Sequence, residues 1–223
     1  MSDGFHPPVE QYLEMMWELE EEDIPIIRAR LAERLGHTAP TVTEMVRKLD
    51  ELGYVETSGR ALSLTTTGRK LAESVARKHR LAERLLVDLI GLEWHKIHEE
   101  AGRWEHVISD EVEARLQILL DHPTTCPHGN PIPGAAHEKT ELRPLADFLG
   151  GERVRLERVS ERVEDDLASL KYLDDHNFRP GATAEVRLRA PDGTLTLAVG
   201  TQTLAVGHAL AALLFVSDLP AAV

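Results

Sequence analysis

The 223-residue sequence has a single cysteine, Cys126, and no long run of apolar residues. One thiol excludes a framework of internal disulfides. No apolar stretch approaches the ~20 residues of a membrane span or resembles the apolar segment of a secretory signal. A hydrophobic share of 42% is nevertheless ordinary for a globular protein. We therefore expect a cytoplasmic protein without a membrane partner, long enough for one large domain or, preferably, two modest ones.

Positive charge is also scarce, because 25 Lys and Arg face 38 Asp and Glu, for a net charge of −13. This balance argues at first against a nucleic-acid partner. The distribution argues otherwise, because residues 28–84 hold twelve Lys and Arg against seven Asp and Glu. That segment carries a net +5 and the remainder −18. Since binding to phosphate depends on the local face, a basic module on an acidic body remains compatible with DNA binding.

Helical periodicity predicts three helices near the N-terminus, at residues 10–22, 27–35 and 39–52. Gly36 ends the second helix, while Thr38 is placed to cap the third. A short helix, a tight turn and a longer helix are typical of the helix-turn-helix. A small hairpin at residues 54–64 and a long helix follow, so the sequence predicts a winged helix.

The third helix is the predicted recognition helix. Its larger apolar residues are expected to pack inward, and its small residues suit contact with thymine methyl groups. With the basic side chains of flanking elements, the candidate DNA contacts are Arg28, Arg30, Thr38, Ala39, Pro40, Thr41, Thr43, Glu44, Arg47, Lys48 and Arg60. The alternative is a helical hairpin that never meets DNA.

Metal-binding side chains gather just after this module. His79 and Glu83 are four residues apart, and His98, Glu105 and His106 share one stripe of another helical segment. Crossing helices would bring imidazole and carboxylate groups around one or two cations. Such a set favours manganese, ferrous iron or cobalt over copper(I) or a closed structural zinc site. The simpler interpretation, solvated polar helix faces, suits any one of these residues alone better than the set.

Several separated motifs resemble one known family. In chain order they are RARLAERL, PTVT, LTTTGR, RKHRLAERLL, IGL, GRWEHVISDEVEARL and GNPIPG. Together they resemble the diphtheria toxin repressor and iron-dependent regulator family, which includes the manganese transport regulator. The likeness is dense over residues 9–134 and looser beyond. It implies a mainly α fold with a small β part: an N-terminal winged helix-turn-helix at 1–74, a helical metal-binding and dimerisation domain at 75–143 with a Pro-rich linker from 122, and a C-terminal SH3-like domain, similar to ferrous-transport accessory domains, at 144–223.

The resemblance also implies two metal sites. His79, Glu83 and His98 match the family's ancillary site, and Glu105 and His106 match its primary site. All helix ligands of the ancillary site are present, so we expect that site to be the more certain to hold metal.

The primary site departs from the family pattern. Gly102 stands where the iron branch has a cysteine and the manganese branch a glutamate, and Gln11 replaces a methionine of the iron branch. Glu14 falls where the manganese branch has a ligand glutamate. Two outcomes are open: a working site of Glu14, Glu105 and His106 with help from Gln11, or a weak site that leaves sensing to the ancillary one.

The C-terminal third alternates like short strands at residues 152–160, 183–190, 194–199 and 201–206, with a helix expected at 164–177. In the family this domain lends an acid and a glutamine to the ancillary metal. Glu164 falls on the acid and Leu167 on the glutamine, for which Asp165 or Asp166 is a substitute; a solvated helix start is the alternative. A separate cluster of Cys126 with His122 and His128 is expected to be a bare Pro-rich loop.

The resulting prediction is a metal-dependent transcriptional regulator, not an enzyme, with Mn(II) or Fe(II) as corepressor for metal-uptake genes. It binds a palindromic double-stranded DNA operator as a homodimer, without a small-molecule substrate. The apolar interface is expected from Leu85, Leu86, Leu89, Ile90, Trp94, Trp104, Val107, Ile108, Val112, Leu116 and Leu119. One alternative is a di-metal carboxylate enzyme, although no histidine follows a glutamate at the E-x-x-H spacing of such bundles. The other is a DNA-binding regulator that senses a non-metal ligand through its C-terminal domain.

Overall fold

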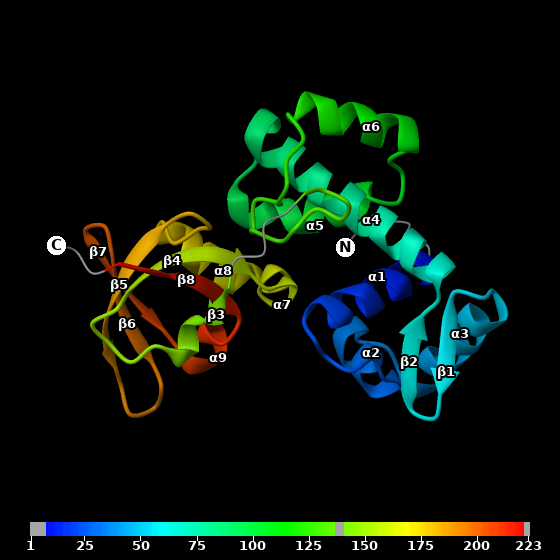
Figure 1. The fold of residues 1–223 in the computed structure, drawn as a ribbon, viewed down its shortest axis with the longest axis horizontal. Helices are drawn as coiled ribbons and strands as arrows, with labels where there is room; N and C mark the ends of the chain where they lie inside the picture. Colours follow the sequence, from blue (N-terminus) through cyan, green and yellow to red (C-terminus); the bar gives the residue numbers. More distant parts are fainter. Residues whose placement is uncertain (1–7, 137–140, 221–223) are drawn as a thin grey trace.

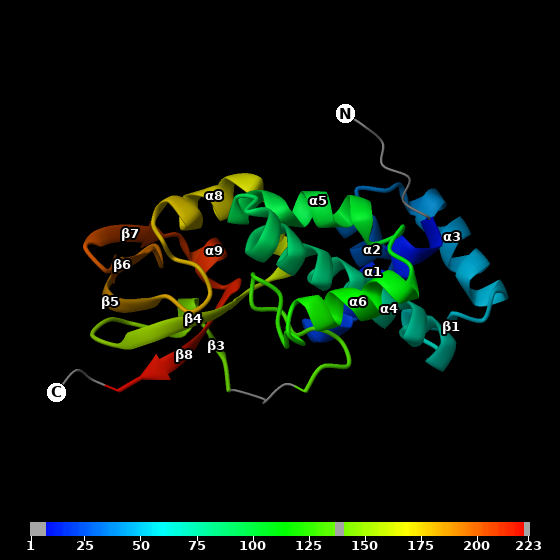
Figure 2. The ribbon, with the colours of Figure 1, turned by 90° about the horizontal axis from the view of Figure 1, so that it is seen from above.

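The computed structural model describes residues 8–136 and 141–220. Three parts are visible in Figure 1: a winged-helix unit, a helical middle part built on the long helix α4 (Thr66–Leu85), and a small β-sheet domain. This arrangement confirms the predicted fold class. Figure 2 shows α8 (Leu167–Asp175) near one end of α5 (Ile97–Trp104), where the helical part meets the β-sheet domain, and α8 contacts the turn Trp94–Lys96 that precedes α5.

The N-terminal unit contains the expected helix-turn-helix and wing. Its elements are α1 (Pro8–Glu21), α2 (Arg28–Leu35), α3 (Ala39–Glu51), β1 (Val55–Ser58) and β2 (Ala61–Leu64). Gly36 ends α2 with a positive φ of 64°, and the Thr38 side chain accepts a hydrogen bond from the amide of Thr41 at the start of α3. Buried Val42, Val46 and Leu49 turn one face of α3 into a core shared with α1.

The middle part begins with α4 (Thr66–Leu85), which also closes the winged-helix core. It ends in a π-helical turn at Leu86–Ile90, followed by a 3-10 turn at Trp94–Lys96. Two helices, α5 (Ile97–Trp104) and α6 (Asp110–Leu119), pack on α4. α4 therefore runs through two of the three parts, and side chains on it contact both.

The C-terminal domain is an antiparallel sheet of order β3-β8-β4-β5-β6-β7. The strands are β3 (Arg143–Pro144), β4 (Arg153–Val159), β5 (Thr183–Arg189), β6 (Leu195–Val199), β7 (Gln202–Val206) and β8 (Leu214–Leu219). Four match the predicted strands. β3 and β8 were not predicted, and neither were the one-turn helix α9 (His208–Ala211) and the 3-10 turn Leu145–Asp147.

The predicted helix 164–177 is wrong in its extent. The chain forms α7 (Glu161–Glu164), breaks, and resumes as α8 (Leu167–Asp175). The break arises because Asp166 leaves helical geometry and its side chain caps α8, accepting hydrogen bonds from the amides of Ala168 and Ser169. This break keeps Glu164 at the end of α7, directed toward the middle part.

The β-sheet domain is docked on the helical part. Ala82, Trp94 and Ile97 belong to the same buried apolar cluster as the sheet residues Leu156 and Val186. The Pro-rich segment after α6 lies between them, with the amide of Val159 donating to the carbonyl of His128. A side chain at Gly129 would collide with the carbonyl of Glu157, so the segment approaches β4 more closely than other residues allow.

One buried cation joins all three parts. Arg80 of α4 is 1% exposed, and its guanidinium donates to Glu21 of α1 at 2.7 Å and to Glu161 of α7 at 2.7 Å. It also donates to the carbonyl of Pro131 and lies over the ring of Trp17, 4.8 Å from its centroid.

Within residues 8–136 and 141–220, no helix combines the length and apolarity needed to cross a bilayer.

Candidate metal centre and nucleic-acid interface

A cavity of about 430 Å³ lies where α1, α4, α5 and α7 meet. Carboxylates and imidazoles from all four elements line it. Together with neighbouring side chains they form two adjoining groups, which we call the inner cluster and the α1 cluster. The inner cluster consists of His79, Glu83, His98, His128 and Glu164; the α1 cluster consists of Glu10, Glu14, His79, Glu105 and His106.

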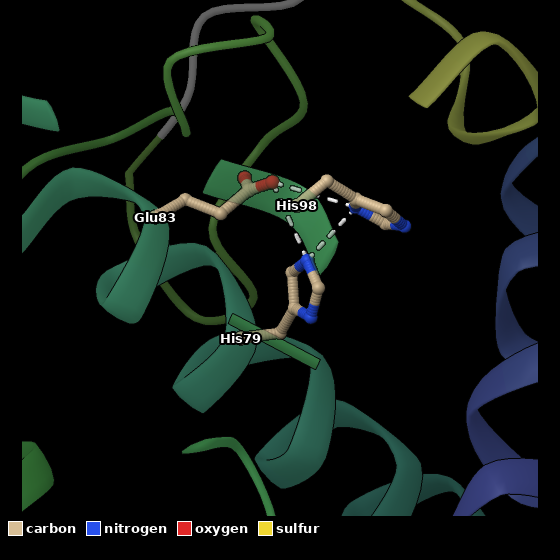
Figure 3. Close-up of side chains that lie close together, drawn as sticks. All are labelled: His79, Glu83 and His98. Atoms are coloured by element: carbon tan, nitrogen blue, oxygen red, sulfur yellow. Dashed lines mark hydrogen bonds and ion pairs between the residues drawn. The ribbon is translucent and has the colours of Figure 1, made fainter. Parts of the chain in front are cut away.

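The inner cluster begins on two helices, as predicted. His79 and Glu83 lie one turn apart on α4, and His98 projects toward them from α5 (Figure 3). The Nε2 of His79 is 3.1 Å from the Nδ1 of His98, and one Glu83 oxygen lies 3.4 Å and 3.5 Å from those atoms. Glu83 is fully buried. One cation could reach all three donors without a change in the backbone.

The C-terminal domain adds carboxylates to this cluster. Glu164, 4% exposed, is 3.2 Å from the Nδ1 of His98, and Asp165 is 3.5 Å from its Nε2. Of the two acids considered as substitutes for the family's glutamine, which is Leu167 here, Asp165 lies beside the cluster. Asp166 instead caps α8. The solvated alternative for Glu164 does not hold.

His128 was missed by the sequence interpretation. The Pro-rich segment is a loop, as expected, but it is not bare: His128 is completely buried, 3.1 Å from Glu83 and 2.9 Å from Glu164. Cys126, 1% exposed, offers its thiol to the same Glu83 and His128. The signal was present in Cys-Pro-His, but only the folded chain brings it to α4. The donor set therefore includes a possible thiolate ligand.

The α1 cluster gathers around Glu105. Its carboxylate is 2.5 Å from the Nδ1 of His79 and 3.0 Å from the Nε2 of His106. Glu14 reaches the same group from α1. Glu10, which was not predicted, is 2.7 Å from the Nδ1 of His106. His79 accordingly faces both clusters, one ring nitrogen toward each, and does not belong to the ancillary set alone.

Gly102 and Gln11, the two departures from the family pattern, both line the cavity. A Cβ built on Gly102 would meet no atom within 4 Å. The position of the absent ligand is thus open space rather than a filled gap. Glu14 of α1 lines the same cavity.

The charges of the two clusters are strongly coupled. Burial lowers the pKa of His128, but Glu164 and Glu83 outweigh it and raise that pKa to about 10. Burial raises the pKa of Glu105, but His106 and His79 lower it to about 2. Burial, then Glu105 and Glu18, raise the pKa of Glu14 well above its usual range. Imidazolium and carboxylate groups thus balance one another in the metal-free chain.

The donor set fits a divalent first-row metal. Imidazole nitrogens and carboxylate oxygens, with one thiol nearby, suit such ions. Two buried atoms support the fit, because the Oε2 of Glu83 and the Nε2 of His128 have no hydrogen-bond partner among the described residues. Buried polar atoms without a partner are costly and call for a ligand.

We expect metal binding to release protons and to weaken on acidification. The pKa values of His79, His98 and His128 are raised against the effect of burial by neighbouring carboxylates, which favours protonated imidazole in the metal-free chain. A metal must displace these protons, and apparent affinity should rise with pH up to about the raised pKa of His128, about 10. Calorimetry of Mn(II) binding in buffers of different ionisation enthalpy measures the release. An enthalpy that is independent of the buffer contradicts this account.

Most of the predicted DNA contacts are exposed to solvent. The exposed residues, most of them on or beside α3, are Arg30, Thr38, Ala39, Pro40, Thr41, Thr43, Glu44, Arg47, Lys48 and Arg60. Arg28 is only half-buried at the start of α2. Arg47 is paired with Glu51 at 2.7 Å, a surface pair that phosphate can displace at little cost. The recognition face therefore presents small and polar groups outward.

The predicted dimer surface is only partly available. Leu89, Ile90, Val107, Val112 and Leu119 are exposed, at 48% to 73% of their surface. In contrast, Leu86, Trp94 and Leu116 are buried within their own chain and cannot serve as an interface. Ile118 of α6, 63% exposed, joins the available set. We call Val112, Ile118 and Leu119 the α6 patch.

Three family models match the chain. They are described as the iron dependent repressor N-terminal DNA binding domain (residues 5–61), the iron dependent repressor metal binding and dimerisation domain (65–134), and the FeoA domain (143–218). The Iron-dependent repressor IdeR of Mycobacterium leprae (strain TN) is 40% identical over 214 residues, 91% of this chain and 93% of the relative. The Diphtheria toxin repressor of Corynebacterium diphtheriae (strain ATCC 700971 / NCTC 13129 / Biotype gravis) is 43% identical over 199 residues, 84% and 87% of the two chains.

Solved structures of metal-dependent repressors are also similar to this chain. A manganese-dependent transcriptional repressor in complex with manganese is similar with a TM-score of 0.84 and 31% identity, covering 95% of this chain and all of that one. ScaR with bound Zn²⁺ is similar with a TM-score of 0.78 and 31% identity, covering 96% and 100%. The likeness therefore extends over all three parts of the chain.

Proposed function

The chain belongs to the iron-dependent repressor family, and from that premise we propose that it is a metal-activated repressor of metal-uptake genes whose corepressor is Mn(II) or Fe(II). Members of this family are DNA-binding transcriptional repressors, which contradicts the alternative of a di-metal carboxylate enzyme. The observation that supports the proposal is that His79 belongs to both the inner cluster and the α1 cluster. Its ring contacts donors on α5 and, through Glu105, the donors of α1.

The ligand assignment is also proposed. His79, Glu83, His98 and Glu164, with His128 and Cys126 beside them, would hold one cation, and Glu14, Glu105 and His106 a second, with Gln11 at its edge. When bound, the metal supplies positive charge that holds carboxylates of different elements together. Hard oxygen donors and the open space at Gly102 favour Mn(II) or Fe(II) over Cu(I).

The protein side of the mechanism is a population shift. Glu14 on α1 lies near Glu105 in one cavity, and burial together with this neighbour raises the pKa of Glu14, so the metal-free arrangement disfavours two charged carboxylates there. A ligand that binds the closed arrangement more tightly shifts the chain toward it. α1 is packed in the same core as α3, so fixing α1 against α4 fixes the recognition helix.

The DNA side follows from symmetry. A two-fold dimer formed through the exposed apolar residues presents two copies of α3, which suits a palindromic operator with half-sites about one helical turn apart. Arg30, Lys48 and Arg60 are proposed to contact phosphates, and the outward residues of α3 the base edges. A cytoplasmic location is consistent with this task.

Titration of operator binding against Mn(II), Fe(II) and a chelator tests the proposal. We expect binding to rise between five- and roughly 150-fold on metal addition, the usual range for coupled sites, and to fall again with chelator. Binding that is strong in chelator and insensitive to either metal would instead support the regulator that senses a non-metal ligand.

A further inference from the structure

A hydrogen bond links the metal-lined helix to the turn of the helix-turn-helix. Tyr12 of α1 is 1% exposed, yet its hydroxyl lies 2.8 Å from the Nδ1 of His37. The two rings are tilted by 30°, with centroids 5.6 Å apart. The hydroxyl is the one polar atom of this buried side chain, and its hydrogen bond to the turn residue helps to hold that residue in place.

His37 occupies a decisive position in that turn. It lies between Gly36, where α2 ends in a left-handed conformation, and Thr38, which caps α3. The direction of the recognition helix is set by these three residues, because α3 starts immediately after them. His37 directly precedes the capping residue, so holding its side chain in place restrains the backbone from which α3 starts.

The other end of the link is the cavity. Gln11, Glu14 and Glu18 of α1 line it, and Tyr12 is adjacent to Gln11 on the same rigid helix. Arg34 of α2 makes a parallel connection, 3.5 Å from Glu18 and 3.2 Å from Glu22. Whatever fixes the carboxylate of Glu14 against α4 thus also fixes the hydroxyl of Tyr12.

We propose that Tyr12 and His37 are positioning residues that transmit the metal-fixed setting of α1 to the recognition helix. This inference rests on the proposed metal site at α1. Neither side chain is assigned to metal or to DNA; the pair acts through the placement of Thr38 and the start of α3. It predicts a defect in operator binding that appears only when metal is bound.

Three variants of the full-length protein test the pair: Tyr12→Phe, His37→Ala and their double mutant. With saturating Mn(II), each single variant should weaken operator binding roughly two- to tenfold, the range for one hydrogen bond. Mn(II) affinity, measured by calorimetry without DNA, and operator binding in chelator should remain within twofold of the parent. The double variant should be no weaker than either single one, because both remove the same bond.

A conservative replacement separates positioning from direct DNA contact. His37→Asn places an amide oxygen near the position of the Nδ1 and should restore most of the operator affinity that His37→Ala loses, but only when Tyr12 is intact. Tyr54→Phe, which removes a phenolic hydroxyl elsewhere in the same unit, is the matched control and should behave like the parent. Losses that add in the double variant, or a Tyr12→Phe protein equal to the parent, overturn the proposal.

A Glu14→Ala variant keeps this result distinct from the metal assignment. If Glu14→Ala retains full stimulation by metal, the proposed site at α1 is wrong, and Tyr12 and His37 have no metal-fixed setting of α1 to transmit. If Glu14→Ala loses stimulation while Tyr12→Phe does not, the site stands and the proposed role of the pair fails.

Discussion

Replacing His79 with alanine should reduce metal-stimulated operator binding by on the order of 100-fold, near the upper end of coupling between sites. The physical reason is that one ring serves both clusters. Its Nδ1 faces Glu105 at 2.5 Å and its Nε2 faces His98 at 3.1 Å, so the variant removes a donor from each. Fluorescence anisotropy with a labelled operator, at increasing Mn(II) or Fe(II), measures the loss.

A histidine outside the cavity provides the control for this change. His208 is exposed on α9 of the C-terminal domain, and His208→Ala should leave metal stimulation unchanged. Circular dichroism must show that His79→Ala retains its helices. Normal stimulation in a folded His79→Ala protein would falsify the assignment of both clusters.

Placing a carboxylate in the α6 patch should separate the dimer. Ile118 is 63% exposed between Val112 and Leu119 on an apolar surface of α6. An unpaired aspartate buried there costs several kcal/mol, so Ile118→Asp should raise the dimer dissociation constant by on the order of 100-fold or more. Because one copy presents one recognition helix, operator affinity should fall with it. Light scattering and operator titration measure the two effects.

A matched leucine lies elsewhere on the surface. Leu188 of β5 is 59% exposed, so Leu188→Asp introduces the same charge on the β-sheet domain. This control should remain dimeric and bind operator normally. A dimeric Ile118→Asp protein would show that copies meet through another surface.

Local patterns were sufficient to predict most of the helical part of the fold. The α2–α3 turn could be predicted because Gly36 and Thr38 act on their immediate neighbours, and His79 and Glu83 because they share one helix face. The break before α8 was missed, since Asp166 can either continue a helix or cap one, and only packing decides. Strand β8 was missed because its two neighbours in the sheet, β3 and β4, lie far from it in the sequence.

The same limit applies to the metal centre. Its α4 and α5 donors were found from spacing, but His128 contacts Glu83 across 45 residues of sequence and Glu10 contacts His106 across 96. Cys126 comes to the same centre in the loop that carries His128. Sequence spacing carries no information about such contacts. The buried surfaces of Leu86 and Trp94 were assigned to a dimer for the same reason, because periodicity cannot distinguish an internal partner from a second copy.

The buried guanidinium of Arg80 has a consequence for how the chain unfolds. It donates hydrogen bonds to Glu21 of the winged-helix unit, to Glu161 of the β-sheet domain and to the carbonyl of Pro131. Detaching either carboxylate removes an ion-pair partner from the buried guanidinium, which is unfavourable. The three parts are thereby tied into one cooperative unit, and thermal melting of this chain should proceed as a single transition rather than domain by domain.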